Sequence, residues 1–172
     1  MFNNCKTYLQ KLLPKRKLNA AQLWQQLGRE AGSAYWFVAY PVHLVLQRDT
    51  FSLASPVPLQ VEAAEAIALT DALNTHFNED GVEFFWQDEY WFLKLKAHPN
   101  IHNFSPQQAL NQDISRFLPT GAGARAWAAF QNEVQMLLFT HAVNQARDVR
   151  HLPIINSIWC DNGGQFESTH AN

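Results

Sequence analysis

The sequence contains little cysteine and no long hydrophobic run. Two of its 172 residues are cysteine, Cys5 and Cys160, which excludes a disulfide framework and leaves at most a single bridge. No stretch approaches about 18 uncharged apolar residues, so the sequence has no obvious transmembrane helix. The first residues also lack the apolar core and cleavage site of a secretory signal. Two free thiols suit a reducing compartment, and these features together predict a cytoplasmic protein.

Charge is also sparse and nearly balanced. Thirteen Lys and Arg residues face fifteen Asp and Glu residues, which gives a net charge of −2. Such a chain has no overall field for polyanions, so we expect neither a nucleic acid nor a membrane as partner. Apolar residues make up 47% of the sequence, which is too many for a disordered chain. The length is typical of one domain that buries its own core.

The order of the segments predicts one α+β domain over residues 19–166. Residues 1–18 form a basic arm that we expect to be solvated, with a short amphipathic helix as the alternative. Residues 167–172 form a C-terminal tail. Periodicity and turn residues predict helices over 19–29, 62–78, 105–117 and 125–150, and strands over 35–40, 42–47, 51–54, 82–86, 90–95 and 153–159.

Strands and helices alternate too irregularly for a doubly wound parallel sheet. The sequence therefore predicts an antiparallel or mixed sheet of about five to six strands packed by helices, with a long buried C-terminal helix followed by a final strand. The clearest local feature is a hairpin over 82–95. Alternation places Phe84 and Trp86 on one face and Phe85 on the other, so at least one aromatic ring needs cover from a helix or from a second copy in a homodimer.

The helix over 125–150 is apolar nearly all round, yet it contains Glu133 and His141. Helical spacing places Glu133, His141 and Asn144 on one face. Buried polar groups are costly unless paired, so we expect all three to be buried with polar partners, and Asn156 or Ser157 to lie close by. Glu133→Ala should then cost about 1–3 kcal/mol of stability.

Two interpretations of this stripe are open. The polar side chains could anchor neighbouring strands and loops. Alternatively, they could face a cleft and hold a small polar or anionic ligand, in which case the candidate binding residues are Glu133, His141, Asn144, Arg147, Asn156 and Ser157. Arg147 could also simply cap the C-terminal end of its helix.

The same region resembles the RpfE-type regulatory proteins. The similarity rests on residues 132–138 (NEVQMLL), residues 140–147 (THAVNQAR) and residues 156–159 (NSIW), followed by the Gly163–Gly164 pair. Ala142 stands where the Thr-His-Pro-x-Asn pattern has proline, and the chain ends soon after Gly164, where members of this type continue. The resemblance implies a regulatory or ligand-responsive role without demonstrated catalysis.

Members of this type often carry the label cofactor-independent phosphoglycerate mutase, which implies two divalent metals held by Asp and His residues. The Asp residues here fall mostly in turns and helix ends, and His98 and His102 are separated by Pro99 in a loop. We therefore expect no metal site, no cofactor and no mutase activity. A hydrolase or phosphotransferase that uses Ser157, His141 and Glu133 is the alternative, and a structural interaction module is a third class.

Overall fold

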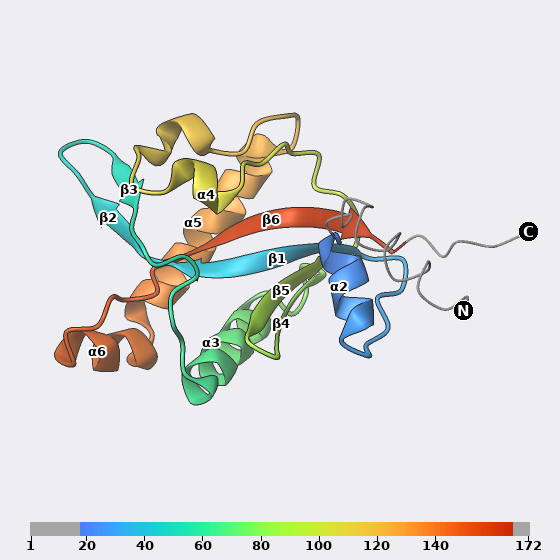
Figure 1. The fold of residues 1–172 in the computed structure, drawn as a ribbon, viewed down its shortest axis with the longest axis horizontal. Coiled ribbons are helices and arrows are strands. Elements are labelled where there is room, and N and C mark those ends of the chain that lie inside the picture. The colour runs from blue at the N-terminus through green and yellow to red at the C-terminus, as the bar shows by residue number, and fades with distance from the viewer. Residues whose placement is uncertain (1–17, 167–172) are drawn as a thin grey trace, which may run out of the picture.

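A computed structural model describes residues 18–166 and shows an α+β fold (Figure 1). A four-stranded antiparallel sheet has the order β4–β5–β1–β6, and β2 and β3 form a separate two-stranded sheet. The strands are β1 (Tyr35–Val42), β2 (Leu44–Leu46), β3 (Phe51–Leu53), β4 (Val82–Gln87), β5 (Tyr90–Leu95) and β6 (Ser157–Gln165). The helices are α2 (Ala20–Gln26), α3 (Ala63–His76), α4 (Pro106–Ala109), the 3-10 helix η1 (Ile114–Phe117), α5 (Ala124–Thr140) and α6 (Ala142–Val149). The expected fold class and six strands are confirmed, with the strands divided between two sheets.

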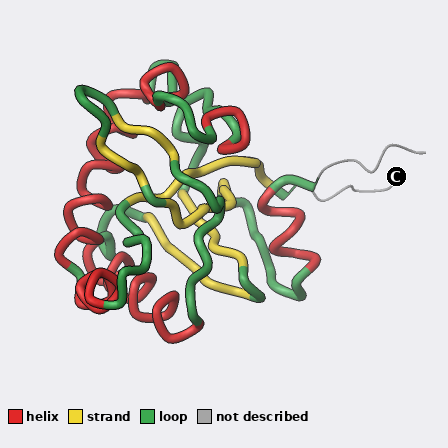
Figure 2. The backbone as a smooth tube through the Cα atoms, turned by 60° about the vertical axis from the view of Figure 1, so that its left-hand side comes forward, coloured by secondary structure: helices red, strands yellow, loops and turns green. Residues whose placement is uncertain are grey.

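Helices lie on both sides of the strands (Figure 2). One face of the large sheet packs against α3 and α5, where Phe37, Leu69 and Val134 belong to the main core. The opposite face is covered by α2, whose Trp24 packs with Trp36. Both faces of the central strand β1 are therefore buried, which explains its nearly continuous apolar sequence.

The predicted hairpin is present, and its aromatic rings divide between the two faces. Phe84 lies in the core beneath α3 and α5, and Phe85 packs against Trp24 of α2. The ring that needed cover therefore receives it from a helix of the same chain. Asn19 begins α2 as predicted, because its side chain accepts a hydrogen bond from the backbone N–H of Gln22 at 2.9 Å.

The predicted helix over 105–117 is interrupted. Its first turn forms α4, but Asn111 adopts a left-handed φ of 58°, and its N–H bonds the carbonyl of Leu53. Asp113 then caps the 3-10 helix η1 by accepting from the N–H of Ser115. Asn and Asp side chains compete with helical hydrogen bonding in this way, so propensity alone overestimated the helix.

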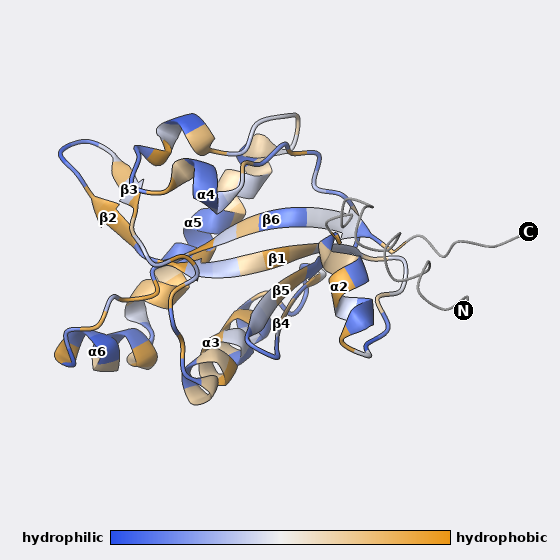
Figure 3. Ribbon diagram, in the orientation of Figure 1, coloured by the Kyte–Doolittle hydropathy of each residue, from blue (hydrophilic) through white to orange (hydrophobic). Residues whose placement is uncertain are grey.

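The long C-terminal helix is broken at His141, which separates α5 from α6. His141 has extended backbone angles, and its Nδ1 accepts a hydrogen bond from the N–H of Val143, so the residue serves as the N-cap of α6. The expectation of burial on all sides was also wrong. Met136 and Phe139 are each 71% exposed, and hydrophilic turns alternate with hydrophobic ones along α5 (Figure 3).

Two further expectations concern the ends of the fold. The final strand begins at Ser157, later than predicted, because residues 153–156 form a connection that bonds α6 and β2.

The basic arm lies almost wholly outside the described residues. Over 18–166, no helix combines the length and the hydropathy that a bilayer crossing requires.

Candidate ligand-binding site

The break at His141 separates the residues predicted to share one helix face. Glu133 is exposed, and its Oε2 lies 3.2 Å from Nε2 of His76 on α3. His141 is partly exposed and is engaged in capping α6. The expectation that Glu133 and His141 are both buried on one stripe was therefore wrong, although each has a polar partner as predicted.

Asn144 is only 2% exposed and binds three backbone groups. Its Nδ2 donates to the carbonyl of Leu138 at 2.8 Å and to the carbonyl of Ile155 at 2.7 Å. Its Oδ1 accepts from the N–H of Ile155 at 2.7 Å. The side chain thus ties the end of α5 to the segment before β6, as the anchoring interpretation requires.

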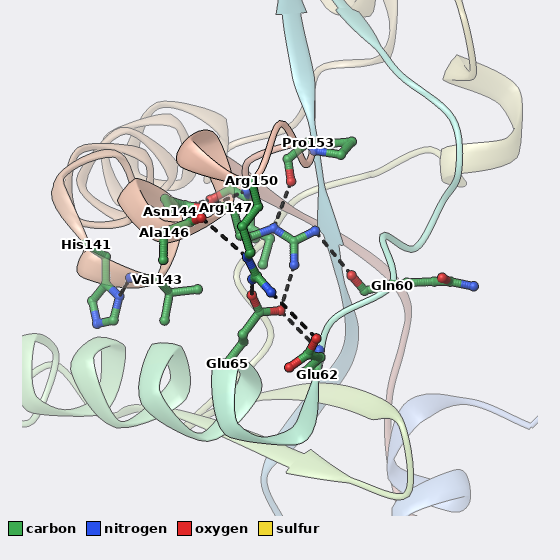
Figure 4. A network of polar contacts seen from close by, with 11 residues as sticks. Gln60, Glu62, Glu65, His141, Val143, Asn144, Ala146, Arg147, Arg150 and Pro153 are labelled. Carbon is green, nitrogen blue, oxygen red and sulfur yellow. Dashed lines mark hydrogen bonds and ion pairs between the residues drawn. The ribbon is translucent and has the colours of Figure 1, made fainter.

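Arg147 lies at the centre of a buried ionic network (Figure 4). Its Nη1 donates to Oε2 of Glu65 at 2.6 Å, and its Nε and Nη2 donate to the carbonyls of Pro153 and Gln60. Arg150 reaches the other carboxylate oxygen of Glu65 at 2.7 Å. The guanidinium of Arg147 joins α6 to α3 and to the segment before α3, so it does more than cap its own helix.

Sequence reasoning missed Glu65, the buried partner of Arg147. The residue is 8% exposed, and its carboxylate also accepts from the N–H of Glu62 in the capping box of α3. The capping pattern Glu-x-x-Glu before an apolar helix was a readable signal for the carboxylate position. The pairing itself spans 82 residues of sequence, and no local pattern reveals it.

Asn156 and Ser157 also bind groups outside the predicted stripe. Asn156 exchanges two hydrogen bonds with the backbone of Leu44, at 2.7 and 2.8 Å, and so fixes the start of β2. Ser157 is buried, and its hydroxyl accepts from Nε2 of Gln135 at 3.5 Å. Ser157, His141 and Glu133 therefore each bond another group, and the structure does not assemble them as a nucleophile, base and acid.

Two adjoining hollows lie on either side of residues 59–61. The larger, here called the hairpin pocket, encloses about 540 Å³ and is lined by Val38, Ala39, Tyr40, Pro41, Pro58, Leu59, Gln60, Val61, Trp86, Glu89, Tyr90 and Trp91. The smaller, here called the arginine pocket, encloses about 390 Å³ and is lined by Pro56, Leu59, Gln60, Val61, Glu62, Glu65, Arg147, Leu152 and Pro153. Arg147 is the one residue of the predicted binding set that lines either hollow.

The hairpin pocket forms where the sheet opens. The ladder between β1 and β5 ends at the pair Val38–Phe92, whereas β1 continues to Val42. Beyond this point the carbonyl of Pro41 accepts from the N–H of Leu59, so a connecting segment replaces the missing strand. The space between β1 and the hairpin turn becomes the pocket.

Four of the twelve residues that line the hairpin pocket are aromatic. Tyr40 and Trp86 are partly buried, and Tyr90 is 44% exposed at the hairpin turn. Burial, together with the nearby Asp161 and Tyr90, raises the pKa of Tyr40 above its ordinary value. The Tyr40 phenol is therefore neutral at physiological pH and presents a hydroxyl group and a ring to this region.

The described part of the chain has no group of three or more His, Cys, Asp or Glu residues placed to hold a metal ion. His98 and His102 are engaged in loop structure, where Nδ1 of His98 accepts from the N–H of Asn100 and the backbone of His102 pairs with Thr120. Burial raises the pKa of the Cys160 thiol far above its usual range. That thiol is therefore held in its protonated, unreactive form.

No protein-family model matches the sequence, and no curated protein matches it. Among solved structures, a cofactor-independent phosphoglycerate mutase from Thermoplasma acidophilum DSM 1728 has a similar fold, with a TM-score of 0.60 and 14% sequence identity. The alignment covers 83% of this chain and 40% of that enzyme, so the chain spans less than half the length of its structural neighbour. At this identity, the similarity concerns the fold alone.

Proposed function

We propose that this protein is a cytoplasmic regulatory protein of the RpfE type that binds a small polar ligand without transforming it. The observation that carries this proposal is the pair of adjoining pockets, of about 540 and 390 Å³, on either side of residues 59–61. Volumes of this size are typical of small-molecule sites, whose walls are mostly apolar with a few polar groups. The candidate catalytic side chains Ser157, His141 and Glu133 are all engaged elsewhere.

The ionic network supports a preformed site. Arg147 holds the carbonyl of Gln60 at 3.2 Å, and Gln60 lines both pockets. The network also pairs both arginines with Glu65, so its role is to fix the wall of the site rather than to supply a free cation. A wall that is rigid before binding reduces the ordering cost of capturing a ligand.

The local structure around Ala142 is consistent with the RpfE-type pattern. This residue is the first of α6, a position that favours proline because its N–H has no intrahelical partner. The preceding residue, His141, has φ −71° and ψ 139°, which suits a residue before proline. A Thr-His-Pro-x-Asn sequence would therefore form the same turn as the Thr-His-Ala-Val-Asn sequence found here.

Binding can be tested by two-dimensional amide NMR with three probes, namely 3-phosphoglycerate as an anion, choline as a cation and indole as a neutral ring. We expect at least one probe to shift the amides of Ala39, Gln60 and Glu89. Gln60→Trp should reduce these shifts by narrowing the pocket that its larger side chain enters, because Gln60 is exposed and lines both pockets. Gln107→Trp, an exposed position on α4 outside both pockets, is the matched control.

Two results would overturn the proposal. One is the absence of shifts with all three probes, and the other is a set of shifts confined to residues 133–141. The fold similarity makes phosphoglycerate mutase activity the alternative to test directly. With Mg²⁺ or Mn²⁺ present, we expect no interconversion of 3-phosphoglycerate and 2-phosphoglycerate above the blank, and robust turnover would establish the enzymatic alternative.

A further inference from the structure

The hairpin pocket combines aromatic walls with one carboxylate. Glu89 is its only acidic lining residue, and no Lys, Arg or His residue lines it. Trp86 and Trp91 pair across β4 and β5 and pack on the core side of the sheet, whereas Tyr40 and Tyr90 contribute rings from the face that α2 covers. Aromatic ring faces carry partial negative charge and attract cations, whereas an anion would find no positive partner here.

The backbone of the hairpin turn provides a second, independent observation. Asp88 and Glu89 both have positive φ, at 47° and 70°. A two-residue hairpin turn with both residues in this region strongly favours Gly, Asn or Asp, and Gly is preferred at the second position. Glu89 therefore occupies a strained backbone position that glycine would fill more easily. Retained strain of this kind is a reason to look for function.

We infer that the hairpin pocket binds a small organic cation, with an ammonium group placed between the aromatic rings and the Glu89 carboxylate. The inference rests on the proposed function and specifies its ligand class. Methyl or methylene groups on the cation would lie against the ring of Tyr90, which adjoins Glu89 at the hairpin turn and is 44% exposed. The acidic side chain of Glu89 supplies the charge that rings alone cannot, and this accounts for a glutamate at a glycine-like position.

The pocket differs in charge from the neighbouring arginine pocket. In the arginine pocket, Arg147 and Arg150 share the carboxylate of Glu65, and Arg150 also lies 3.7 Å from the carboxylate of Glu62, so the two positive charges face two negative ones. An anion would have to displace Glu65 from a buried pair, which is costly. The cation site is therefore in the hairpin pocket, and the small ligand expected from the sequence is cationic rather than anionic.

Choline and its neutral isostere 3,3-dimethylbutan-1-ol are suitable probes, with Trp fluorescence and amide NMR as the measurements. We expect the alcohol to bind about tenfold more weakly than choline, since it lacks the charge that the rings and Glu89 recognise. Glu89→Gln should weaken choline binding by about five- to tenfold. Asp88→Asn removes one charge from the same turn outside the pocket lining, so it should change affinity less than twofold.

Glu89→Gly separates the binding role of this residue from a structural one. Relief of the positive-φ strain should raise Tm by about 2–4 °C, while choline binding should fall at least as far as in Glu89→Gln. Loss of both stability and binding would show that Glu89 acts structurally and would overturn the inference. Gln60→Trp should weaken choline binding by narrowing the pocket.

The outcomes for the ligand class and for the proposed function are distinguishable. Equal binding of choline and its isostere would refute the cation site and leave the proposed function intact. The same conclusion would follow if 3-phosphoglycerate shifted the amides of Ala39, Gln60 and Glu89 and choline did not. Choline shifts that persist unchanged in Glu89→Gln would also refute the cation site. If no probe shifted these amides, both the cation site and the proposed function would be refuted.

Discussion

The ionic network around Arg147 and the hairpin pocket lie on opposite sides of one short segment, yet they use polar groups in different ways. In the network, the carboxylate of Glu65 and the guanidinium of Arg147 are buried and paired, and Arg147 also bonds two carbonyls. In the pocket, the carboxylate of Glu89 stands at the surface of a strained turn. Paired buried charges hold the walls in place, whereas the open aromatic pocket is available to a ligand.

Sequence composition does not separate these two roles. Arg147 and Glu89 are both charged residues near helix or strand ends, and only their partners distinguish them. Substitutions in the network should therefore act mainly on the free energy of unfolding, and substitutions in the pocket should act mainly on binding.

Arg147→Ala should give the largest loss, about 3 kcal/mol of unfolding free energy, because it leaves the exposed Arg150 as the only charged partner of the buried Glu65 carboxylate. Urea denaturation measures this change. Arg29→Ala removes an arginine whose Nη2 bonds Gln87 at the surface, so it should cost under about 0.5 kcal/mol. If Arg147→Ala costs no more than this control, the network does not hold the wall of the site.

Asn144→Ala should cost about 2 kcal/mol, since it leaves the buried N–H and carbonyl of Ile155 without partners and removes one of the two hydrogen bonds to the carbonyl of Leu138. Chemical denaturation again provides the measurement. Gln145→Ala, at an exposed neighbouring position on α6, is the control and should change stability by under about 0.5 kcal/mol. Similar values for the two variants would contradict the anchoring role of Asn144.

Ala142→Pro should stabilise the protein by about 0.4–1 kcal/mol. The substitution restricts the unfolded chain, and both the first position of α6 and the extended conformation of His141 accept proline. Val143→Pro is the matched control, because it removes the N–H that bonds Nδ1 of His141 and should destabilise α6. A lower Tm for Ala142→Pro would show that residue 142 requires its N–H.

Glu133→Ala should have the smallest effect, under about 0.5 kcal/mol, because its contact with His76 is exposed on both sides. The sequence alone predicted a loss of about 1–3 kcal/mol from a buried acid. Thermal unfolding of this variant alongside His76→Ala decides between the two values. A loss above 1 kcal/mol would mean that Glu133 is buried in solution.

Periodicity predicted the α+β class and the aromatic hairpin, because β-branched and aromatic residues alternate clearly there. One of the two interpretations of the polar stripe was that its side chains anchor neighbouring strands and loops, and Asn144 does so by bonding the backbone of Ile155. Periodicity failed at His141, where a side-chain cap and the bonds of Asn144 terminate α5. A helical wheel assumes an unbroken helix, so it placed Glu133 and Asn144 on one face.

The candidate site was harder to predict than the fold. Arg147 was identified among the site residues, but its partner Glu65 and the pocket residue Glu89 were not. The pairing of Glu65 depends on the contact between α3 and α6, and the pocket beside Glu89 depends on where β1 loses its pairing with β5. Local patterns reveal neither of these long-range arrangements. The strained turn at Asp88–Glu89 was visible only as a polar interruption between two strands.

The pairing of β1 with β6 has a consequence for how the chain folds. Tyr35 lies opposite Gln165, so the central strand of the sheet receives one of its two neighbours from more than a hundred residues later in the chain. During synthesis, β1, β4 and β5 emerge first, and the backbone N–H and C=O groups on one edge of β1 then have no strand to pair with. Contacts of such long sequence separation slow folding and leave unpaired edges exposed to other chains. Chaperone protection during translation should therefore matter until residues 157–165 have left the ribosome.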